Sequence, residues 1–445
     1  MSAYNLSQAG HKTLLLEARH RIGGRSWTLP LRSNPDAIIE MGATWINETS
    51  QPFSYRITKE FDIETEEQYE EGAVIEQDEE GNIDRGSYQP EKRKRSLGSV
   101  EKFYIALGIA AETVDINNFN KFPEDKDVTM SEWAAKLKLG NETAVQAACD
   151  TLVRGIVGRD AHEVGAHYFL DYVKSGDGLA SLTNDLEGAQ QLKFKKGTSA
   201  ITDALANAMP EGRIWLNSPV DEITQHGDGE VHVRTKSGLR CKAKKVIVAI
   251  PTNTYTKIHF TPPLPEDKRA LVTRTMPGIY AKVLINYASP WWREAGLAGK
   301  FRSIIGPIGF SFDTSDLDAQ QYSLAIFVTG HVAAAWHQLT DLGREEAIIE
   351  HLAELAGPEL ADKARDVTEI NTVEWTKEDY LWGGPTCAMR PGMLRKYGEA
   401  LREPFGDLHF GGGETAYEWK GYLEGALLAG VRAAEEVLES LGDPN

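Results

Sequence analysis

The chain has 445 residues, of which 41% are hydrophobic and 26% charged, so it has the composition of a globular protein and the length of two domains. Its formal net charge of −18 argues against a nucleic-acid partner and against docking on an anionic membrane surface. Three widely separated cysteines describe neither a disulfide framework nor a zinc site, and no metal site is expected.

The N-terminal segment reads as a helix, a turn and a strand. A weak apolar stripe in residues 2–9 has helical spacing, and Gly10 is placed to end that helix. Residues 13–16 then form a short apolar run that closes at Glu17. A continuous apolar run suits a parallel strand buried on both faces, so this segment predicts the helix and second strand of a βαβ unit.

The rest of the chain alternates between acidic, helical and strand-like stretches. Residues 64–82 are strongly acidic and predict a surface hairpin or loop, with a carboxylate metal site as a weaker alternative. Residues 99–208 show mostly helical spacing, and residues 213–250 change to strand character. Further strands are expected at 280–287, 322–329 and 408–410, and further helices at 344–356 and 422–440.

A motif for a dinucleotide follows the first predicted strand. Glu17 ends that strand, Gly23 and Gly24 allow the backbone to approach a ligand, and Arg25 can reach a phosphate. In a dinucleotide fold, an acid at this place accepts hydrogen bonds from the adenosine ribose. Acid, paired glycines and arginine in this order are a specific signal.

These residues and several later segments resemble the flavin monoamine oxidase family over nearly the whole chain. The similarity is carried by LLLEARHRIGGRSWT (14–28), MGATWIN (41–47), HYFLDYVKS (167–175), GAQQLKFKKGTSAI (188–201), NSPVDEI (217–223), KKVIVAIPTNTYTKIHFTPPLP (244–265), PWWRE (290–294) and, most specifically, HFGGGETAYEWKGYLEGALLAGVRAAEEVL (409–438). The chain is most similar to soluble fungal members, some of which act on bulky aliphatic amines of the fumonisin type.

The resemblance implies an α/β fold with α+β parts. A parallel, Rossmann-like FAD-binding sheet is expected to interleave with a substrate domain that has a mixed sheet and helices. We expect the FAD-binding domain in residues 1–60, 196–265 and 385–445, and the substrate-binding domain in residues 61–195 and 266–384.

The resemblance also implies the residues that bind FAD. They are expected to be Glu17, Ala18, Arg19, Gly23, Gly24, Arg25, Gly42, Ala43, Thr44, Trp45, Val220, Gly413, Glu414 and Tyr422. Glu414 follows three glycines and suits the ribityl hydroxyls. The helix that starts near Tyr422 would direct its positive N-terminal end at the pyrimidine edge of the flavin.

Five residues are implied in catalysis. Lys282 matches a lysine that holds a water near flavin N5, and Tyr422 matches one wall of an aromatic cage. Trp419 is a further aromatic candidate over the flavin face, and Gln190 resembles a glutamine that lines the cavity. Thr386 stands where the second aromatic wall is usual. Without the resemblance, Lys282 would read as an ordinary strand lysine.

The residues after Gly383-Gly384 bear on how the flavin is held. Pro385 stands where some family members carry the cysteine that is bonded to flavin, and Cys387 lies two places further on. We therefore expect that FAD is bound without a covalent bond. The alternative is a covalent bond between the flavin and Cys387, two positions after the usual cysteine. Tyr168 and Phe169 are candidates for the cavity entrance, although aromatic helix positions are more often core.

The chain departs from the family pattern at its start. The family begins with a strand and a GxGxxG loop, whereas this sequence starts inside the helix that follows them. About 16 residues of a ~30-residue βαβ unit are absent by this alignment. We expect a truncated start, and the alternative is a divergent form with weakened FAD binding.

The expected activity is oxidation of a primary or secondary amine by FAD, with O2 reduced to H2O2. The alternatives are a non-catalytic, FAD-free binding module, or a flavin oxidase of polyamines or amino acids. No signal peptide, membrane span or peroxisomal signal is visible, so a cytoplasmic protein, possibly a homo-oligomer, is expected.

Overall fold

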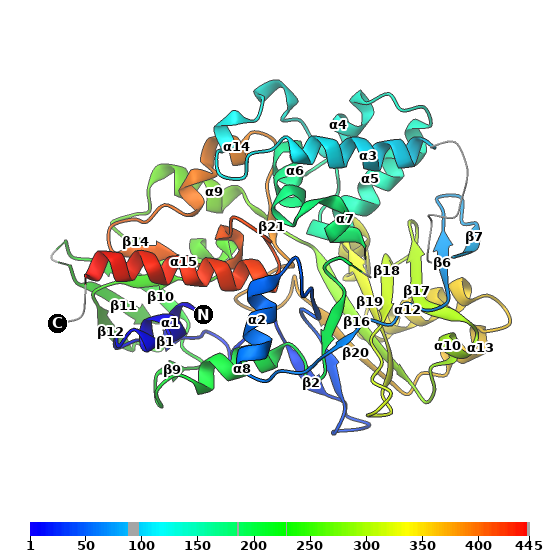
Figure 1. The fold of residues 1–445 in the computed structure, drawn as a ribbon, viewed down its shortest axis with the longest axis horizontal. Helices are drawn as coiled ribbons and strands as arrows, with labels where there is room; N and C mark the ends of the chain where they lie inside the picture. Colours follow the sequence, from blue (N-terminus) through cyan, green and yellow to red (C-terminus); the bar gives the residue numbers. More distant parts are fainter. Residues whose placement is uncertain (88–97, 185–186, 228, 443–445) are drawn as a thin grey trace.

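The structure is a computed structural model that describes residues 1–87, 98–184, 187–227 and 229–442. Figure 1 shows a long C-terminal helix beside small sheets at one end of the molecule and a large sheet at the other, with a layer of helices above. The α-helices of the described residues are α1 (Ser2–Gln8), α2 (Pro52–Glu60), α3 (Ser99–Glu112), α4 (Met130–Lys136), α5 (Glu142–Val157), α6 (Ala166–Ser175), α7 (Gly178–Thr183), α8 (Ser199–Asn207), α9 (Glu266–Arg274), α10 (Trp291–Glu294), α11 (Gly330–Trp336), α12 (Asp341–Ala356), α13 (Ala361–Arg365), α14 (Met393–Tyr397) and α15 (Leu423–Leu441).

The nucleotide-type region is built from segments far apart in the sequence. Strand β1 (Leu15–Leu16) pairs in parallel with β9 (Ile214–Trp215), and β13 (Val246–Val248) pairs in parallel with β22 (Leu408–Phe410). This confirms the expected parallel strands from three separate stretches. Within the described residues they form two separate pairs.

Two smaller sheets and two further short strand pairs are also present among the described residues. One sheet has the order β12 (Arg240–Ala243), β11 (Val231–Thr235), β10 (Val220–Gln225) and β14 (His259–Thr261). The other places β8 (Leu192–Phe194) between β4 (Trp45–Ile46) and β5 (Thr65–Glu67). The pairs are β2 (Thr28–Pro30) with β3 (Ile38–Glu40), and β15 (Met276–Pro277) with β21 (Cys387–Ala388).

A seven-stranded mixed sheet forms the other end of the molecule. Its order is β20 (Glu369–Glu374), β16 (Tyr280–Tyr287), β19 (Tyr322–Thr329), β18 (Phe310–Asp313), β17 (Leu297–Ser303), β6 (Ala73–Gln77) and β7 (Ile83–Ser87). The predicted strands 280–287 and 322–329 match β16 and β19 in full. Every residue of β16 is buried, which explains its nearly continuous apolar sequence.

Alternation along β16 assigns its two faces to different parts of the molecule. Ala281, Val283 and Ile285 pack in one cluster with Ile348 and Leu352 of α12. The residues between them face the other way, and Tyr280 and Leu284 pack with Leu31, Ile39 and Met41. Lys282 shares this second face.

The prediction for residues 64–82 was wrong in part. The segment contains β5 and β6, and β6 lies inside the large sheet between β17 and β7. Val74 and Ile75 are buried, so the apolar centre of this acidic stretch is a sheet strand. Among the described residues, no group of three or more potential ligands could hold a metal ion.

Candidate active site

One cavity of about 2090 Å³ extends from β1 and β13 to the face of the large sheet that carries Lys282. The sequence-predicted residues that line it are Glu17, Ala18, Arg19, Gly23, Gly24, Arg25, Gly42, Ala43, Thr44, Trp45, Gln190, Val220, Lys282, Gly413 and Tyr422. These residues come from the first 45 positions, the middle and the C-terminal part of the chain, so folding gathers them at one site.

At the end of the cavity that lies next to β1, a carboxylate stands beside a glycine whose backbone is accessible to a ligand. Glu17 follows β1 and accepts a hydrogen bond from the Arg19 backbone N–H at 2.8 Å. Gly24 has φ of +56°, and a Cβ added there would meet no atom within 4 Å, so its backbone is open to a ligand. Burial raises the pKa of Glu17, opposed by hydrogen bonding from the Arg19 amide.

A buried ion pair lies deeper in the same region. Arg25 Nη1 donates to Glu414 Oε1 at 2.6 Å and also contacts the Pro385 carbonyl. Glu414 does not itself line the large cavity and reaches it through Arg25. Its second oxygen, Oε2, is buried and accepts no hydrogen bond in the part of the chain that the structure describes.

These features fit the FAD that the sequence predicts. The cavity is lined by an acid for ribose hydroxyls, a guanidinium for phosphate and glycine backbone at Gly24 and Gly413. The N-terminal residue of the 19-residue helix α15, Leu423, also lines it. Such a helix end favours negative charge on a ligand.

Lys282 is the buried cation at the other end of this cofactor region. Its side chain is 1% exposed, and Nζ donates to the Gly42 carbonyl at 2.9 Å and to Thr44 Oγ1 at 2.6 Å. Burial lowers the pKa of Lys282 to about 7, and attraction to Glu40 opposes that shift. The ammonium therefore titrates near neutrality and lies against the turn predicted to line the flavin.

Glu40 is the acidic partner that the sequence reasoning did not identify. It ends β3 and accepts hydrogen bonds from the Thr198 backbone N–H at 3.0 Å, from Thr198 Oγ1 at 2.7 Å and from the Thr28 hydroxyl. Burial raises its pKa, and these donors and Lys282 act against the shift. Its only sequence signal is its place directly before the MGATWIN turn.

Two tyrosines lie side by side in the cavity, between the residues expected to bind FAD and the aromatic residues of the large sheet. The rings of Tyr172, on α6, and Tyr422, at the start of α15, have centroids 6.3 Å apart at an interplanar angle of 47°. Both line the cavity. Gly421 makes this approach possible, because a Cβ there would lie 2.3 Å from Tyr172 Oη.

Four aromatic or polar candidates lie away from the large cavity. Trp419 is 3% exposed and packs edge-on beneath Tyr422, with centroids 5.1 Å apart. Thr386 is 1% exposed and borders a separate small cavity with Glu414 and Tyr168. Phe169 is fully buried in the core. The second aromatic residue beside Tyr422 is therefore Tyr172, one helical turn after Tyr168.

Cys387 also faces away from the large cavity. Its thiol is 4% exposed and donates to Asn253 Oδ1 at 3.3 Å. Burial raises the pKa of the Cys387 thiol to about 12, so the thiol form persists at neutral pH.

The large sheet supplies an aromatic floor for the remaining cavity. Phe310 and Phe327 stack with centroids 4.7 Å apart at 17°, and both line the cavity with Phe312, Tyr280 and Trp375. This face was not predicted from the sequence, where the alternation Phe310-Ser311-Phe312 is the local pattern that indicates it. Gln190 lines the cavity too, and its Oε1 is buried without a hydrogen-bond partner among the described residues.

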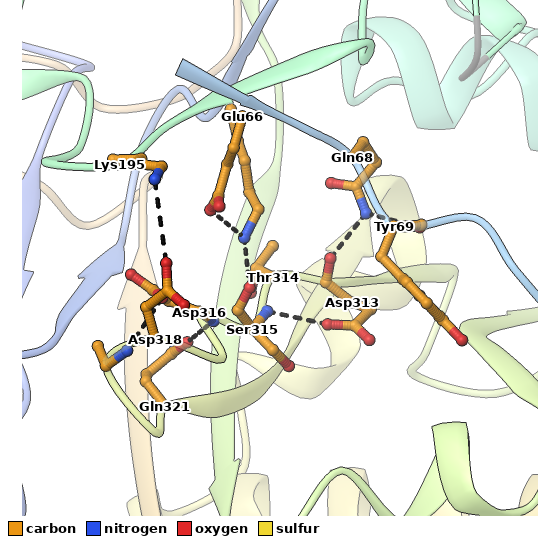
Figure 2. Close-up of polar contacts among 12 residues, drawn as sticks. Glu66, Gln68, Tyr69, Lys195, Asp313, Thr314, Ser315, Asp316, Asp318 and Gln321 are labelled. Atoms are coloured by element: carbon orange, nitrogen blue, oxygen red, sulfur yellow. Dashed lines mark hydrogen bonds and ion pairs between the residues drawn. The ribbon is translucent and has the colours of Figure 1, made fainter. Parts of the chain in front are cut away.

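A polar network fixes Trp45 against this floor. Trp45 Nε1 donates to Gln68 Oε1 at 2.7 Å. Gln68 Nε2 in turn donates to the Asp313 carbonyl at 2.7 Å, as Figure 2 shows. The fully buried Asp313 carboxylate accepts from Trp292 Nε1 at 2.7 Å and Arg293 Nε at 2.5 Å. Trp45 and Phe312 have ring centroids 4.7 Å apart, so the network reaches the cavity wall.

No helix in the described part of the chain is long and apolar enough to cross a membrane.

Comparisons with known proteins agree with this geometry. A sequence model of the family described as flavin containing amine oxidoreductase matches residues 1–438. The chain is 31% identical over 443 residues to the flavin-containing amine oxidase B of Sus scrofa, covering 98% of this chain and 83% of that protein. It is 28% identical to the probable flavin-containing monoamine oxidase A of Dictyostelium discoideum, covering 99% and 95%.

Solved structures give the same relationship. Cyclohexylamine oxidase from Brevibacterium oxydans has a TM-score of 0.90 and 28% sequence identity, with 99% of this chain and 96% of that chain covered. A putrescine oxidase bound to putrescine has a TM-score of 0.89 and 24% sequence identity, with 98% of this chain and 95% of that chain covered. This second similarity shows a shared fold alone.

Proposed function

The chain belongs to the family of flavin-containing amine oxidoreductases and is an FAD-dependent amine oxidase, and we propose that it oxidises apolar primary or secondary amines with O2. The observation that carries the proposal is the position of Lys282 and the Tyr172–Tyr422 pair on one cavity with the FAD-type residues. Phe310, Phe312 and Phe327 line the part of the cavity that lies on the large sheet, which suits an amine with a hydrocarbon substituent.

Bound FAD would supply a two-electron acceptor for amine oxidation, with O2 as the final oxidant. The overall products would be hydrogen peroxide and an imine, which water hydrolyses to a carbonyl compound and an amine or ammonia. The protein's own contribution is to hold the amine in a dry site with its α-carbon directed at the acceptor.

The tyrosines guide the amine with their ring faces. Burial raises the pKa of both Tyr172 and Tyr422 above the usual value, so neither phenol is ionised at neutral pH. A buried phenol of this kind is a poor proton acceptor. The two rings instead form an electron-rich slot that orients the nitrogen of a neutral amine.

Lys282 places a proton and a positive charge beside the Gly42–Thr44 turn. Because its pKa is about 7, the ammonium and the neutral amine are both populated near neutrality. We propose that the charged form stabilises the negative charge that develops on the acceptor during hydride transfer.

We propose that FAD is held without a covalent bond. Pro385 lines the cavity at the position of the usual cysteine, and its side chain has no nucleophile. The Cys387 thiol donates a hydrogen bond to Asn253 and does not line that cavity. The domain boundaries, the cytoplasmic location, the fungal affinity and the homo-oligomeric state stay predictions.

The proposal is tested by incubating the purified protein, with FAD added to saturation, with hexylamine, benzylamine and cyclohexylamine in air. We expect hydrogen peroxide and the matching aldehyde or ketone in equal amounts. Peroxide formation from none of the three amines would overturn the proposed substrate class.

A further inference from the structure

Two glycines inside helices line the large cavity, although neither their backbone nor their packing requires glycine. Gly108 lies in α3 and Gly155 in α5, and neither has a positive φ. A Cβ added to Gly108 would meet no other described part of the chain within 4 Å. A Cβ added to Gly155 would lie 3.5 Å from Phe310 Cε1, which is an ordinary contact distance. Both glycines line the large cavity.

Glycine is an unfavourable residue at these two positions. It loses more backbone entropy on folding than alanine does, so it destabilises a helix relative to alanine. Because the methyl group of alanine would fit at both positions, the stability of the fold does not explain either glycine. What each glycine provides is a missing side chain, which leaves volume in the cavity.

The two glycines belong to neighbouring helices in the layer above the large sheet (Figure 1). Phe103 and Leu107 of α3 pack with Val153 of α5 in one buried cluster. The residues beside this buried stripe that line the cavity are Tyr104, Ile105, Gly108, Ile109 and Glu112 on α3, and Thr151, Leu152, Gly155 and Ile156 on α5. Glu112 is ion-paired with Lys174, so the wall around the glycines is mostly apolar, with one hydroxyl and one paired carboxylate.

The sheet register locates Gly155 relative to Lys282. Tyr280 Oη donates to the Gly155 carbonyl at 3.0 Å, which holds this part of α5 against β16. Lys282 pairs with Phe327, and Phe327 pairs with Phe310, the ring next to Gly155. Two steps of about 4.8 Å between strands place the Phe310 position roughly 10 Å from that of Lys282. The space at Gly155 therefore lies beyond the part of the cavity where the amine would react.

We propose that Gly108 and Gly155 are specificity-determining residues that keep this part of the cavity open for a ring-bearing hydrocarbon substituent of the amine. In extended 4-phenylbutylamine the ring spans roughly 6 to 9 Å from the nitrogen, which suits the spacing between Lys282 and Phe310. Offset or edge-on contact with Phe310 adds to the burial of such a ring. This inference rests on the proposed amine oxidation and specifies its substrate class.

The test uses two amines that differ only in the ring, butylamine and 4-phenylbutylamine, on the FAD-saturated protein. The quantity followed is the specificity ratio, defined as kcat/KM for 4-phenylbutylamine divided by kcat/KM for butylamine. We expect a ratio of about ten or more for wild type, because the ring adds buried apolar area. A ratio of one or less would overturn the proposal.

Side chains added at the glycines should remove the specificity. Gly155→Leu and Gly108→Leu should each lower the specificity ratio about tenfold, while kcat/KM for butylamine stays within about threefold of wild type. Gly155→Ala and Gly108→Ala should lower the ratio less and should have a Tm at or above that of wild type, because alanine favours the helix. A glycine kept for packing alone would instead lose Tm with alanine. The control is Lys102→Leu, at an exposed position of α3 outside the cavity lining, which should keep the ratio.

The variants also decide against the proposal. Wild-type specificity ratios in both leucine variants would overturn it, and a fall in only one of them would assign the role to that glycine alone. If Gly155→Leu does not fold, Gly155→Ala and Gly108→Leu decide: a lower ratio in either one supports the proposal, and a wild-type ratio in both overturns it.

Failure of the proposed function has a different signature. If butylamine and 4-phenylbutylamine are oxidised but the glycine variants keep the wild-type ratio, only the glycine assignment is wrong. If no amine is oxidised, the proposed function fails, and binding without turnover then decides the assignment. The rise in Tm caused by 4-phenylbutylamine should exceed that caused by butylamine in wild type and not in Gly155→Leu or Gly108→Leu, and equal behaviour of wild type and both variants would overturn it.

Discussion

The Lys282 ammonium lies 2.9 Å from the Gly42 carbonyl oxygen, although 240 positions of the chain separate the two residues. This contact joins the large sheet to the turn that follows β3. It fixes a titratable cation at the border between the cofactor-type residues and the aromatic cavity, and the first two predictions below depend on that position.

Replacing Lys282 by Met should slow amine oxidation by about tenfold to a hundredfold, because a buried charge beside the acceptor is lost. The pH profile of kcat for the wild type should show an inflection near the Lys282 pKa of about 7. That inflection should be missing in the variant. The control is Lys59→Met, at an exposed position on α2. Equal rates and equal pH profiles for Lys282→Met and wild type would contradict the assignment.

The same group should make stability depend on pH. The pKa of Lys282 is about 7 in the folded protein and 10.5 in its unperturbed state, so the unfolded chain binds more protons between these values. Stability from this group is therefore gained as pH rises from about 7 toward 10.5. The free energy of unfolding of wild type, measured with urea, should rise by up to about 1 kcal/mol per pH unit more than that of Lys282→Met. Parallel curves for the two proteins would refute this linkage.

Tyr172 should act through its ring. Tyr172→Leu removes the face opposite Tyr422 and should lower kcat/KM for benzylamine by about tenfold. Tyr172→Phe keeps the ring and should retain activity within a few-fold. The measurement is steady-state peroxide formation with both variants. A larger loss in the Phe variant than in the Leu variant would assign the role to the hydroxyl group.

FAD should be released when the protein is denatured, because Cys387 lies outside the cavity. After acid precipitation of the FAD-loaded protein, the yellow colour should stay in the supernatant. Cys387→Ser should behave in the same way. Flavin that remains in the wild-type pellet and is released from the Cys387→Ser pellet would show a covalent link to this residue.

Asp313 should matter for stability because its carboxylate is fully buried between Trp292 and Arg293. Asp313→Ala leaves both donors unpaired and should lower the free energy of unfolding by about 3 kcal/mol. The matched control is Asp318→Ala, where the side chain is 92% exposed and the expected change is below about 0.5 kcal/mol. Chemical denaturation of both variants checks this, and equal losses would contradict the network.

Much of the fold could be predicted from the sequence, because buried strands and helices have apolar residues at regular spacing. The run YAKVLINY predicted β16 since both faces of that strand are buried, and the glycines around Glu414 marked the turn before α15. The hairpin predicted for residues 64–82 matches the antiparallel pair β6 and β7, but the acidic neighbours of its short apolar centre hid the pairing of β6 with β17 inside the large sheet.

The site was predicted where one segment carries the chemistry and missed where several segments share it. Lys282 and Tyr422 stand in distinctive local sequences, whereas the contact between Tyr172 and Tyr422 depends on how α6 packs beside α15. Glu40 and Gln68 carry no local signal, since their roles come from partners far along the chain.

The most direct test of the account is the visible spectrum of the purified 445-residue protein, with FAD added and free FAD removed, before and after anaerobic addition of benzylamine. The account predicts protein-bound flavin bands that bleach with the amine and return when air is admitted. A protein that stays colourless after FAD addition, or flavin bands that no amine bleaches, would contradict it.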